Sequence, residues 1–109
     1  MKLDFSAIEE TSYPAFKGGE KELVAKMFFD GALRVIKGRL APGATIGMHT
    51  HSDSCEVIFI TAGRGCAIYD GTRIPLSEGD VHYCPKGHTH SLVNDSSLDM
   101  SFTAVVPAQ

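Results

Sequence analysis

The sequence lacks the long apolar run that a membrane-spanning helix requires, because no apolar stretch approaches roughly 20 residues. Its first ten residues carry acids where a signal peptide would have an apolar segment, so we expect a cytoplasmic protein. An excess of basic residues is also missing. The formal net charge is -3 at pH 7, which offers no broad electrostatic footprint for nucleic acid. We therefore expect neither a membrane nor a nucleic acid as a partner.

Cysteine is scarce, and its spacing forms no recognisable pattern. Cys55, Cys66 and Cys84 are an odd number without a C-x-x-C pair, which argues against a disulfide framework and suits a reducing compartment. No G-x-S-x-G nucleophile elbow is present, and the glycine-rich stretches lack the Lys-Ser/Thr ending of a phosphate-binding loop. The sequence thus gives no support to a serine nucleophile or to a nucleotide-binding loop.

Helix-forming segments are few as well. Turn signals such as Asp70-Gly71 and Pro85-Lys86-Gly87 recur at short intervals, and the segments between them are rich in Val, Ile, Phe, Tyr and Thr. This pattern is typical of many short strands in a sandwich or barrel. Only residues 18–29 fit a helical turn about as well as a strand. At 109 residues the chain is long enough to bury one ordinary core, so we predict a single all-β domain over residues 1–109.

Two local predictions are specific enough to check. Asp70-Gly71 should form a two-residue type I′ turn of a hairpin, since both positions of such a turn favour these residue types. In the last predicted strand, alternate residues form an apolar face, which predicts a core face for Leu98, Met100, Phe102 and Ala104.

Histidine is scarce but clearly patterned. Five histidines occur, and the tripeptide His-Thr-His appears twice, at 49–51 and at 88–90. Residues two apart in a strand point to the same side, so His49 and His51 should share a face with Gly47. Ile46 and Met48 should then share the opposite face.

A carboxylate follows the first tripeptide at Glu56. Two imidazoles and a carboxylate supply the N and O ligands that suit Mn, Fe, Ni, Cu or Zn. Ile58 and Ile60 should continue the face of Glu56 into apolar surroundings, where a carboxylate needs a cation or hydrogen-bond donors. The sequence therefore favours a metal site that includes these three polar side chains.

The second tripeptide contributes differently, because the preceding Pro85-Lys86-Gly87 should hold His88 in a turn. His90, where the strand ladder should begin, is the better ligand candidate. His82 should share a strand face with Cys84, and the sequence leaves open which face of that strand is core. By residue type, Cys84, His88 and His90 also fit part of a competing zinc site with a thiolate ligand, but this site would leave the first tripeptide and Glu56 unexplained.

The spacing of these residues resembles the two motifs of the cupin superfamily. The first motif corresponds to Gly43, five residues, His49-Thr50-His51, four residues, Glu56, six residues and Gly63. The second corresponds to Gly79, five residues, Pro85-Lys86-Gly87, two residues, His90, three residues and Asn94. Together the motifs cover residues 43–94, about half of the chain.

The resemblance implies a small single-domain cupin with a jelly-roll β-barrel, also called a double-stranded β-helix. It further implies a homodimer and one divalent transition metal ion (Mn, Fe, Ni or Zn) that is held by His49, His51, Glu56 and His90. Three imidazoles and one carboxylate leave one or two coordination positions open, which is typical of catalytic rather than structural metal sites.

Two functions follow as hypotheses. The first is a metalloenzyme, such as an isomerase, lyase or dioxygenase, that acts on a small hydroxy or keto acid, sugar or aromatic by Lewis-acid or O₂ chemistry. The second is a non-catalytic, metal-dependent module that binds or senses a small molecule. His88 lies outside the family motif and is either a candidate acid or base or a surface turn residue. The predicted walls of a small, partly apolar pocket are Ile58, Leu92, Met100 and Phe102.

Overall fold

Ten strands and two short 3-10 helices make up the computed structural model, which describes all residues from 1 to 109. The elements are η1 (Phe5–Ala7), β1 (Thr11–Pro14), η2 (Phe16–Gly18), β2 (Glu22–Phe29), β3 (Leu33–Leu40), β4 (Thr45–Thr50), β5 (Glu56–Ala62), β6 (Arg64–Tyr69), β7 (Thr72–Ser77), β8 (Val81–Cys84), β9 (Thr89–Val93) and β10 (Met100–Pro107). The all-β prediction is confirmed, and the ambiguous residues 18–29 contain strand β2. No helix has the length and apolar character needed to cross a membrane.

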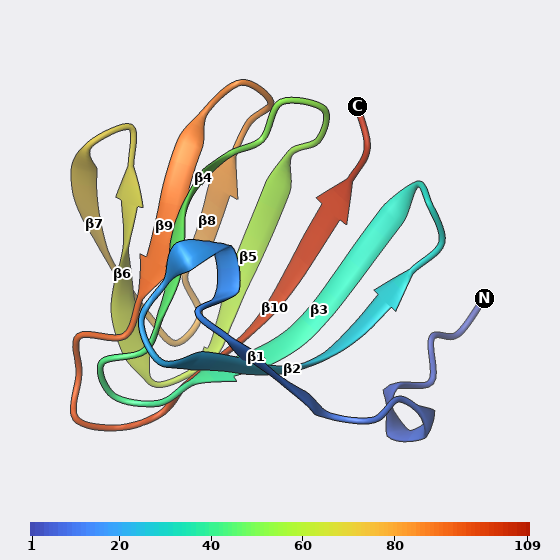
Figure 1. Ribbon diagram of the computed structural model, residues 1–109, viewed down its shortest axis with the longest axis horizontal. Coiled ribbons are helices and arrows are strands. Elements are labelled where there is room, and N and C mark those ends of the chain that lie inside the picture. Colours follow the sequence, from blue (N-terminus) through green and yellow to red (C-terminus); the bar gives the residue numbers. More distant parts are fainter.

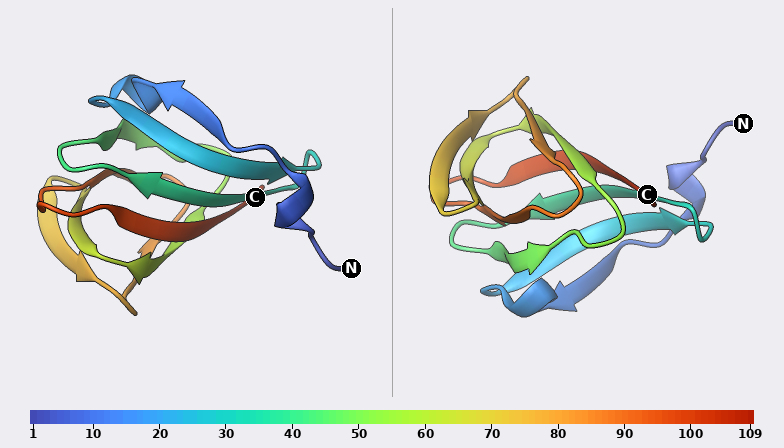
Figure 2. Two further views of the ribbon diagram at one scale, coloured as in Figure 1. Left: turned by 90° about the horizontal axis from the view of Figure 1, so that it is seen from below. Right: turned by 90° about the horizontal axis from the view of Figure 1, so that it is seen from above.

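The strands form two antiparallel sheets (Figure 1). One sheet has six strands in the order β1-β2-β3-β10-β5-β8, and the other has four in the order β4-β9-β6-β7. Seen from the ends in Figure 2, the strands of the two sheets face one another across the interior. Alternating side chains of both sheets fill this interior, and the largest fully buried ones include Phe102, Leu23, Leu40, Ile58, Leu92 and Met100.

Both local predictions can be compared with this arrangement. Tyr69 pairs with Thr72, and φ is 47° at Asp70 and 82° at Gly71, so the type I′ turn between β6 and β7 is confirmed. Met100, Phe102 and Ala104 are buried, as predicted for the core face of β10. The prediction for Leu98 is wrong: its side chain is 72% exposed because it lies in the loop before β10 begins.

A β-bulge in β4 overturns the predicted phase of that strand. Ile46 pairs with Leu92 and His49 pairs with His90, so β4 holds one more residue than β9 between these two pairs. The extra residue places Ile46 beside His49 on the wall of one cavity, whereas Met48 is exposed. The missing side chain of Gly47 makes room for backbone. A Cβ there would lie 2.1 Å from the carbonyl oxygen of Lys17, so the missing side chain lets η2 approach β4.

Asn94 ties the end of the second motif to both sheets. It is fully buried, and its side-chain Nδ2 donates hydrogen bonds to the carbonyl oxygens of Leu40 and Leu98, each at 2.8 Å. Its side-chain oxygen accepts from the amide of Ser96 at 3.0 Å. These bonds satisfy buried polar groups that would otherwise destabilise the fold, and they fix the loop that leads from β9 into β10.

Candidate metal centre

Four side chains from three strands and one loop converge at one point in the interior. His49 lies on β4, His51 directly follows β4, Glu56 begins β5, and His90 lies on β9, where it pairs with His49. One ligand atom from each lies within 4.8 Å of all the others. His51, Glu56 and His90 are buried, and His49 is half-buried. The structure thus brings together all four residues for which the cupin resemblance implied a metal-binding role.

The atoms that meet are the three Nε2 atoms and one carboxylate oxygen. His90 Nε2 lies 3.0 Å from His51 Nε2 and 3.2 Å from His49 Nε2. Glu56 Oε1 lies 2.9 Å from His90 Nε2, 3.1 Å from His51 Nε2 and 3.8 Å from His49 Nε2. Donor atoms bound to one transition metal at about 2.1 Å lie about 3 Å apart when their bonds are at right angles. The donor set and its spacing therefore fit a transition metal ion.

The other nitrogen of each imidazole has its own partner, which fixes the orientation of the ring. His49 Nδ1 donates to the carbonyl oxygen of Gly47 at 2.7 Å. His51 Nδ1 pairs with the hydroxyl of Ser54 at 2.9 Å, and His90 Nδ1 pairs with Nε2 of His82 at 2.9 Å. Partners of this kind around a metal site orient its histidines and raise their basicity.

The electrostatics of Glu56 also suit a ligand role. Burial opposes ionisation of this carboxyl, but hydrogen bonds with His49, His51 and His90 outweigh burial and hold its pKa well below the usual range. Glu56 is thus the negative member of a group whose remaining members are neutral or positive. A buried carboxylate needs a cation or hydrogen-bond donors beside it. The four converging residues provide a site where a metal cation could lie next to Glu56.

His82 lies next to His90, and the sequence left open whether it lies on the core face of its strand. Its strand face proves to be the core face, because His82 and Cys84 are buried whereas Val81 and Tyr83 are each 54% exposed. Burial, followed by the charge of His90, lowers the pKa of His82, which favours a neutral imidazole. The sequence holds one signal for this position. His82 is a polar residue in a short strand whose other members are apolar, which indicates that its side chain has a specific partner.

We predict that replacing His82 weakens metal binding, although His82 is not one of the four converging residues. In His82→Phe, Nδ1 of His90 loses its partner, and the dissociation constant of Zn²⁺ should rise about 10-fold to 100-fold. Competition with a chromophoric chelator measures this constant. His82→Gln, which retains a hydrogen-bonding group, should recover part of the affinity, and the exposed neighbour substitution Tyr83→Ala should leave it unchanged. Equal affinities in wild type and His82→Phe would refute a positioning role.

His88 lies apart from the four converging residues. It occupies the turn before β9, as predicted, and the ladder begins one residue later at Thr89. Its Nδ1 pairs with the Asp70 carboxylate at 2.5 Å, and its ring stacks on that of Tyr69. The hydrogen bond from His88, together with that from the Thr89 amide, lowers the pKa of Asp70. A role of His88 as acid or base stays a prediction.

The competing zinc site is not formed. Cys84 is fully buried, and burial followed by the charge of Glu56 raises the pKa of its thiol to about 11, which disfavours the thiolate that binds zinc. The converging group contains His90 but neither Cys84 nor His88.

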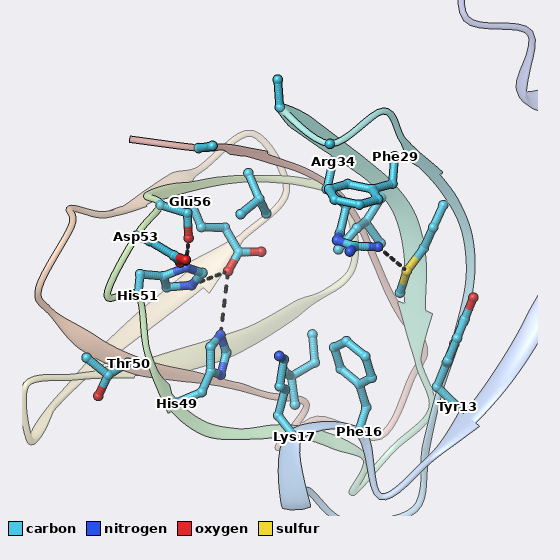
Figure 3. A pocket seen from close by; sticks show the side chains of 18 residues that line it. Tyr13, Phe16, Lys17, Phe29, Arg34, His49, Thr50, His51, Asp53 and Glu56 are labelled. Atoms are coloured by element: carbon cyan, nitrogen blue, oxygen red, sulfur yellow. Dashed lines mark hydrogen bonds and ion pairs between the residues drawn. The ribbon is translucent and has the colours of Figure 1, made fainter.

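A cavity of about 630 Å³ opens onto the cluster and is lined by His49, His51 and Glu56 on that side (Figure 3). The predicted walls are wrong, because Ile58, Leu92, Met100 and Phe102 lie in the core and none of them lines this cavity. The observed apolar walls come mainly from η2, β2, β3 and β4: Phe16, Met27, Phe29, Ile36 and Ile46.

Comparison with protein families decides the relationship. The family model described as "Cupin domain" matches residues 37–106, which include both motifs and all four converging residues. The chain belongs to the cupin family. The structural resemblance agrees, since a crystal structure of a predicted oxalate decarboxylase from Thermotoga maritima covers 100% of both chains with a TM-score of 0.91 at 26% identity.

Two further relatives carry names that describe a ligand or an activity. The oxalate-binding protein of Thermotoga maritima is 34% identical over 68 residues, and the match covers 62% of this chain and 56% of that relative. The chain thus aligns with little more than half of that protein's length. A sugar phosphate isomerase of the cupin superfamily from Silicibacter pomeroyi is 25% identical, with a TM-score of 0.78 and coverage of 100% of this chain and 74% of that one.

Proposed function

We propose that this cupin holds one divalent transition metal ion through His49, His51, Glu56 and His90. The ion would be Mn, Fe, Ni or Zn. The observation that supports this proposal is the convergence of three Nε2 atoms and one carboxylate oxygen within 4.8 Å, with the opposite imidazole nitrogens already engaged. The ion would supply Lewis-acid activation of an oxygen ligand, or O₂ binding in the case of Fe(II).

On this basis we infer a metalloenzyme that acts on a small oxygenated metabolite, with a hydroxy or keto acid as the leading class. The cavity beside the ligand group supports access of such a molecule to the metal. The apolar walls would exclude water from the bound substrate, and the imidazoles and Glu56 would keep the metal fixed at one end of the cavity. The names of the relatives support small acids and sugar phosphates as ligands or substrates of similar folds.

A non-catalytic module that binds or senses a small molecule is the second candidate. The observation that favours it is the name of the relative from Thermotoga maritima, which describes oxalate binding without a reaction. Both candidates need the same metal and the same cavity, and they differ only in whether the bound acid is converted.

Other features of the proposal concern the whole molecule. We propose that residues 1–109 form one cupin domain whose two facing sheets close as a jelly-roll barrel. The exposed apolar side chains Phe59, Val81 and Tyr83, on paired strands β5 and β8, support a homodimer. Three buried cysteines, all free, support a location in the reducing cytoplasm.

The test measures binding and turnover of the same acids. Oxalate and 2-oxo acids should bind the Mn²⁺-loaded protein in calorimetry, and binding should vanish after chelation. Turnover or O₂ uptake with any of these acids would establish the enzyme, whereas binding without turnover would favour the sensing module. In the enzyme, His88→Gln should alter the pH profile of kcat if His88 serves as acid or base. Binding that survives chelation would refute the proposal.

A further inference from the structure

Arg34 is a charged residue on an otherwise apolar inner face. Strand β3 alternates so that Ile36 and Leu40 point into the interior and are buried, and Arg34 has the same phase. Its side chain is half-buried and lines the same cavity as the converging histidines. A charge at such a position is costly unless a partner offsets its desolvation.

No acid of the chain supplies that partner. Arg34 takes part in none of the protein's ion pairs, which join Arg39 to Glu10, Arg73 to Asp95, and histidines to Glu56 and Asp70. The nearest side-chain groups are a thioether sulfur and an aromatic ring, and neither carries a charge. Nη1 lies 3.8 Å from the sulfur of Met27, and the ring of Phe29 lies 4.3 Å from the guanidinium carbon. Most of the five N–H donors of the guanidinium are therefore available to a ligand.

The charges around the cavity favour an anion. Two cations, Lys17 and Arg34, and two acids, Asp53 and Glu56, line it. A divalent ion beside Glu56 would leave the cavity with an excess of positive charge. Arg34 also has the geometry for a carboxylate, because its planar fork can donate two parallel hydrogen bonds.

The size and layout of the cavity indicate a ligand longer than oxalate. Figure 3 shows Arg34 and the group of His49, His51 and Glu56 on different walls of the cavity, and Phe16 on a further wall across from Arg34. A volume of about 630 Å³ lies in the range of pockets that hold drug-sized ligands. Oxalate consists of two directly linked carboxylates and has no carbon chain to contact these apolar walls.

We propose that the cavity selects a 2-oxo dicarboxylic acid longer than oxalate. Its 2-oxo acid end would face the metal-binding group, its carbon chain would contact the apolar walls, and its distal carboxylate would accept hydrogen bonds from Arg34. This inference rests on the proposed function, because it assumes that the acid end reaches the metal. It makes Arg34 a specificity-determining residue.

The experiment compares three acids that share the chelating end. Dissociation constants of oxalate, 2-oxoglutarate and 2-oxopentanoate are measured by calorimetry on Mn²⁺-loaded protein. The two 2-oxo acids have the same chain length and differ in the distal carboxylate. Wild type should bind 2-oxoglutarate at least about tenfold more tightly than 2-oxopentanoate, since only the distal carboxylate can accept charge-assisted hydrogen bonds from Arg34.

The Arg34→Gln variant should bring the two dissociation constants to within about twofold of each other, and should leave that of oxalate unchanged. Arg34→Lys, which keeps the charge but loses the fork, should fall between the two. Arg39→Gln is the matched control, because Arg39 lies on the outer face of the same strand and pairs with Glu10. It should keep the full preference.

The outcomes separate this inference from the proposed function. A damaged fold in Arg34→Gln would weaken the binding of all three acids, whereas the expected loss of affinity is confined to 2-oxoglutarate. Equal binding of the two 2-oxo acids by wild type, or a preference that persists in Arg34→Gln, would overturn the inference while the metal-dependent function stands. Failure of all three acids to bind wild type would overturn both.

Discussion

Metal added to chelator-treated protein should raise the melting temperature by about 15 to 30 °C. A ligand that binds only the folded state at about 1,000 times its dissociation constant stabilises that state by about 4 kcal/mol. In a domain of this size, 1 kcal/mol corresponds to roughly 4–8 °C. The physical reason is that only the folded chain holds three Nε2 atoms and one carboxylate oxygen within 4.8 Å, so the metal binds the folded state and not the unfolded one. Calorimetric unfolding with Zn²⁺ or Mn²⁺ measures the shift.

Mg²⁺ serves as a control of equal charge. It prefers oxygen ligands and retains its waters, so it should shift the melting temperature by no more than a few degrees. Equal shifts with Mg²⁺ and Zn²⁺ would indicate a general charge effect. No shift with any transition metal would count against the site.

The second large effect concerns the first His-Thr-His tripeptide. In the double variant His49→Ala, His51→Ala, the affinity for Zn²⁺ should fall at least about 1,000-fold. Four-ligand zinc sites bind with about 10–16 kcal/mol in total, so the loss of two imidazoles out of four ligands removes a large share of that free energy. Competition with a chelator of known affinity measures the change.

The second tripeptide supplies the matched control. His88→Ala removes an imidazole of the same sequence context, but His88 pairs with Asp70 and lies outside the converging group. This variant should keep the wild-type affinity for Zn²⁺. If His88→Ala weakened binding as strongly as the double variant, the assignment of ligands would have to change.

The sequence predicted the meeting of the four converging residues because the two motifs constrain spacing as well as residue type. Strand alternation placed His49 and His51 on one side, and the turn signal before His88 separated it from His90. His90 and His49 are far apart in the sequence, however, and periodicity alone could not bring them together. Only the family resemblance carried that long-range pairing, which the register of β4 and β9 now displays.

What the sequence could not supply were the features that depend on tertiary context. The bulge in β4 adds a residue that strict alternation does not allow for, so alternation predicts the wrong face for Ile46. Alternation also separates inner from outer positions without distinguishing a packed core from an open cavity. For this reason the sequence predicts Phe102 on a pocket wall although it lies in the core, and does not single out Arg34, which lines the cavity.

Elemental analysis of wild-type protein, purified without added metal, tests the central claim most directly. We expect about one transition metal ion per chain, held by His49, His51, Glu56 and His90, and a content near background in the His49→Ala, His51→Ala variant prepared in parallel. A wild-type preparation without transition metal, which also fails to take up Mn²⁺, Fe²⁺, Ni²⁺ or Zn²⁺ on dialysis, would contradict it.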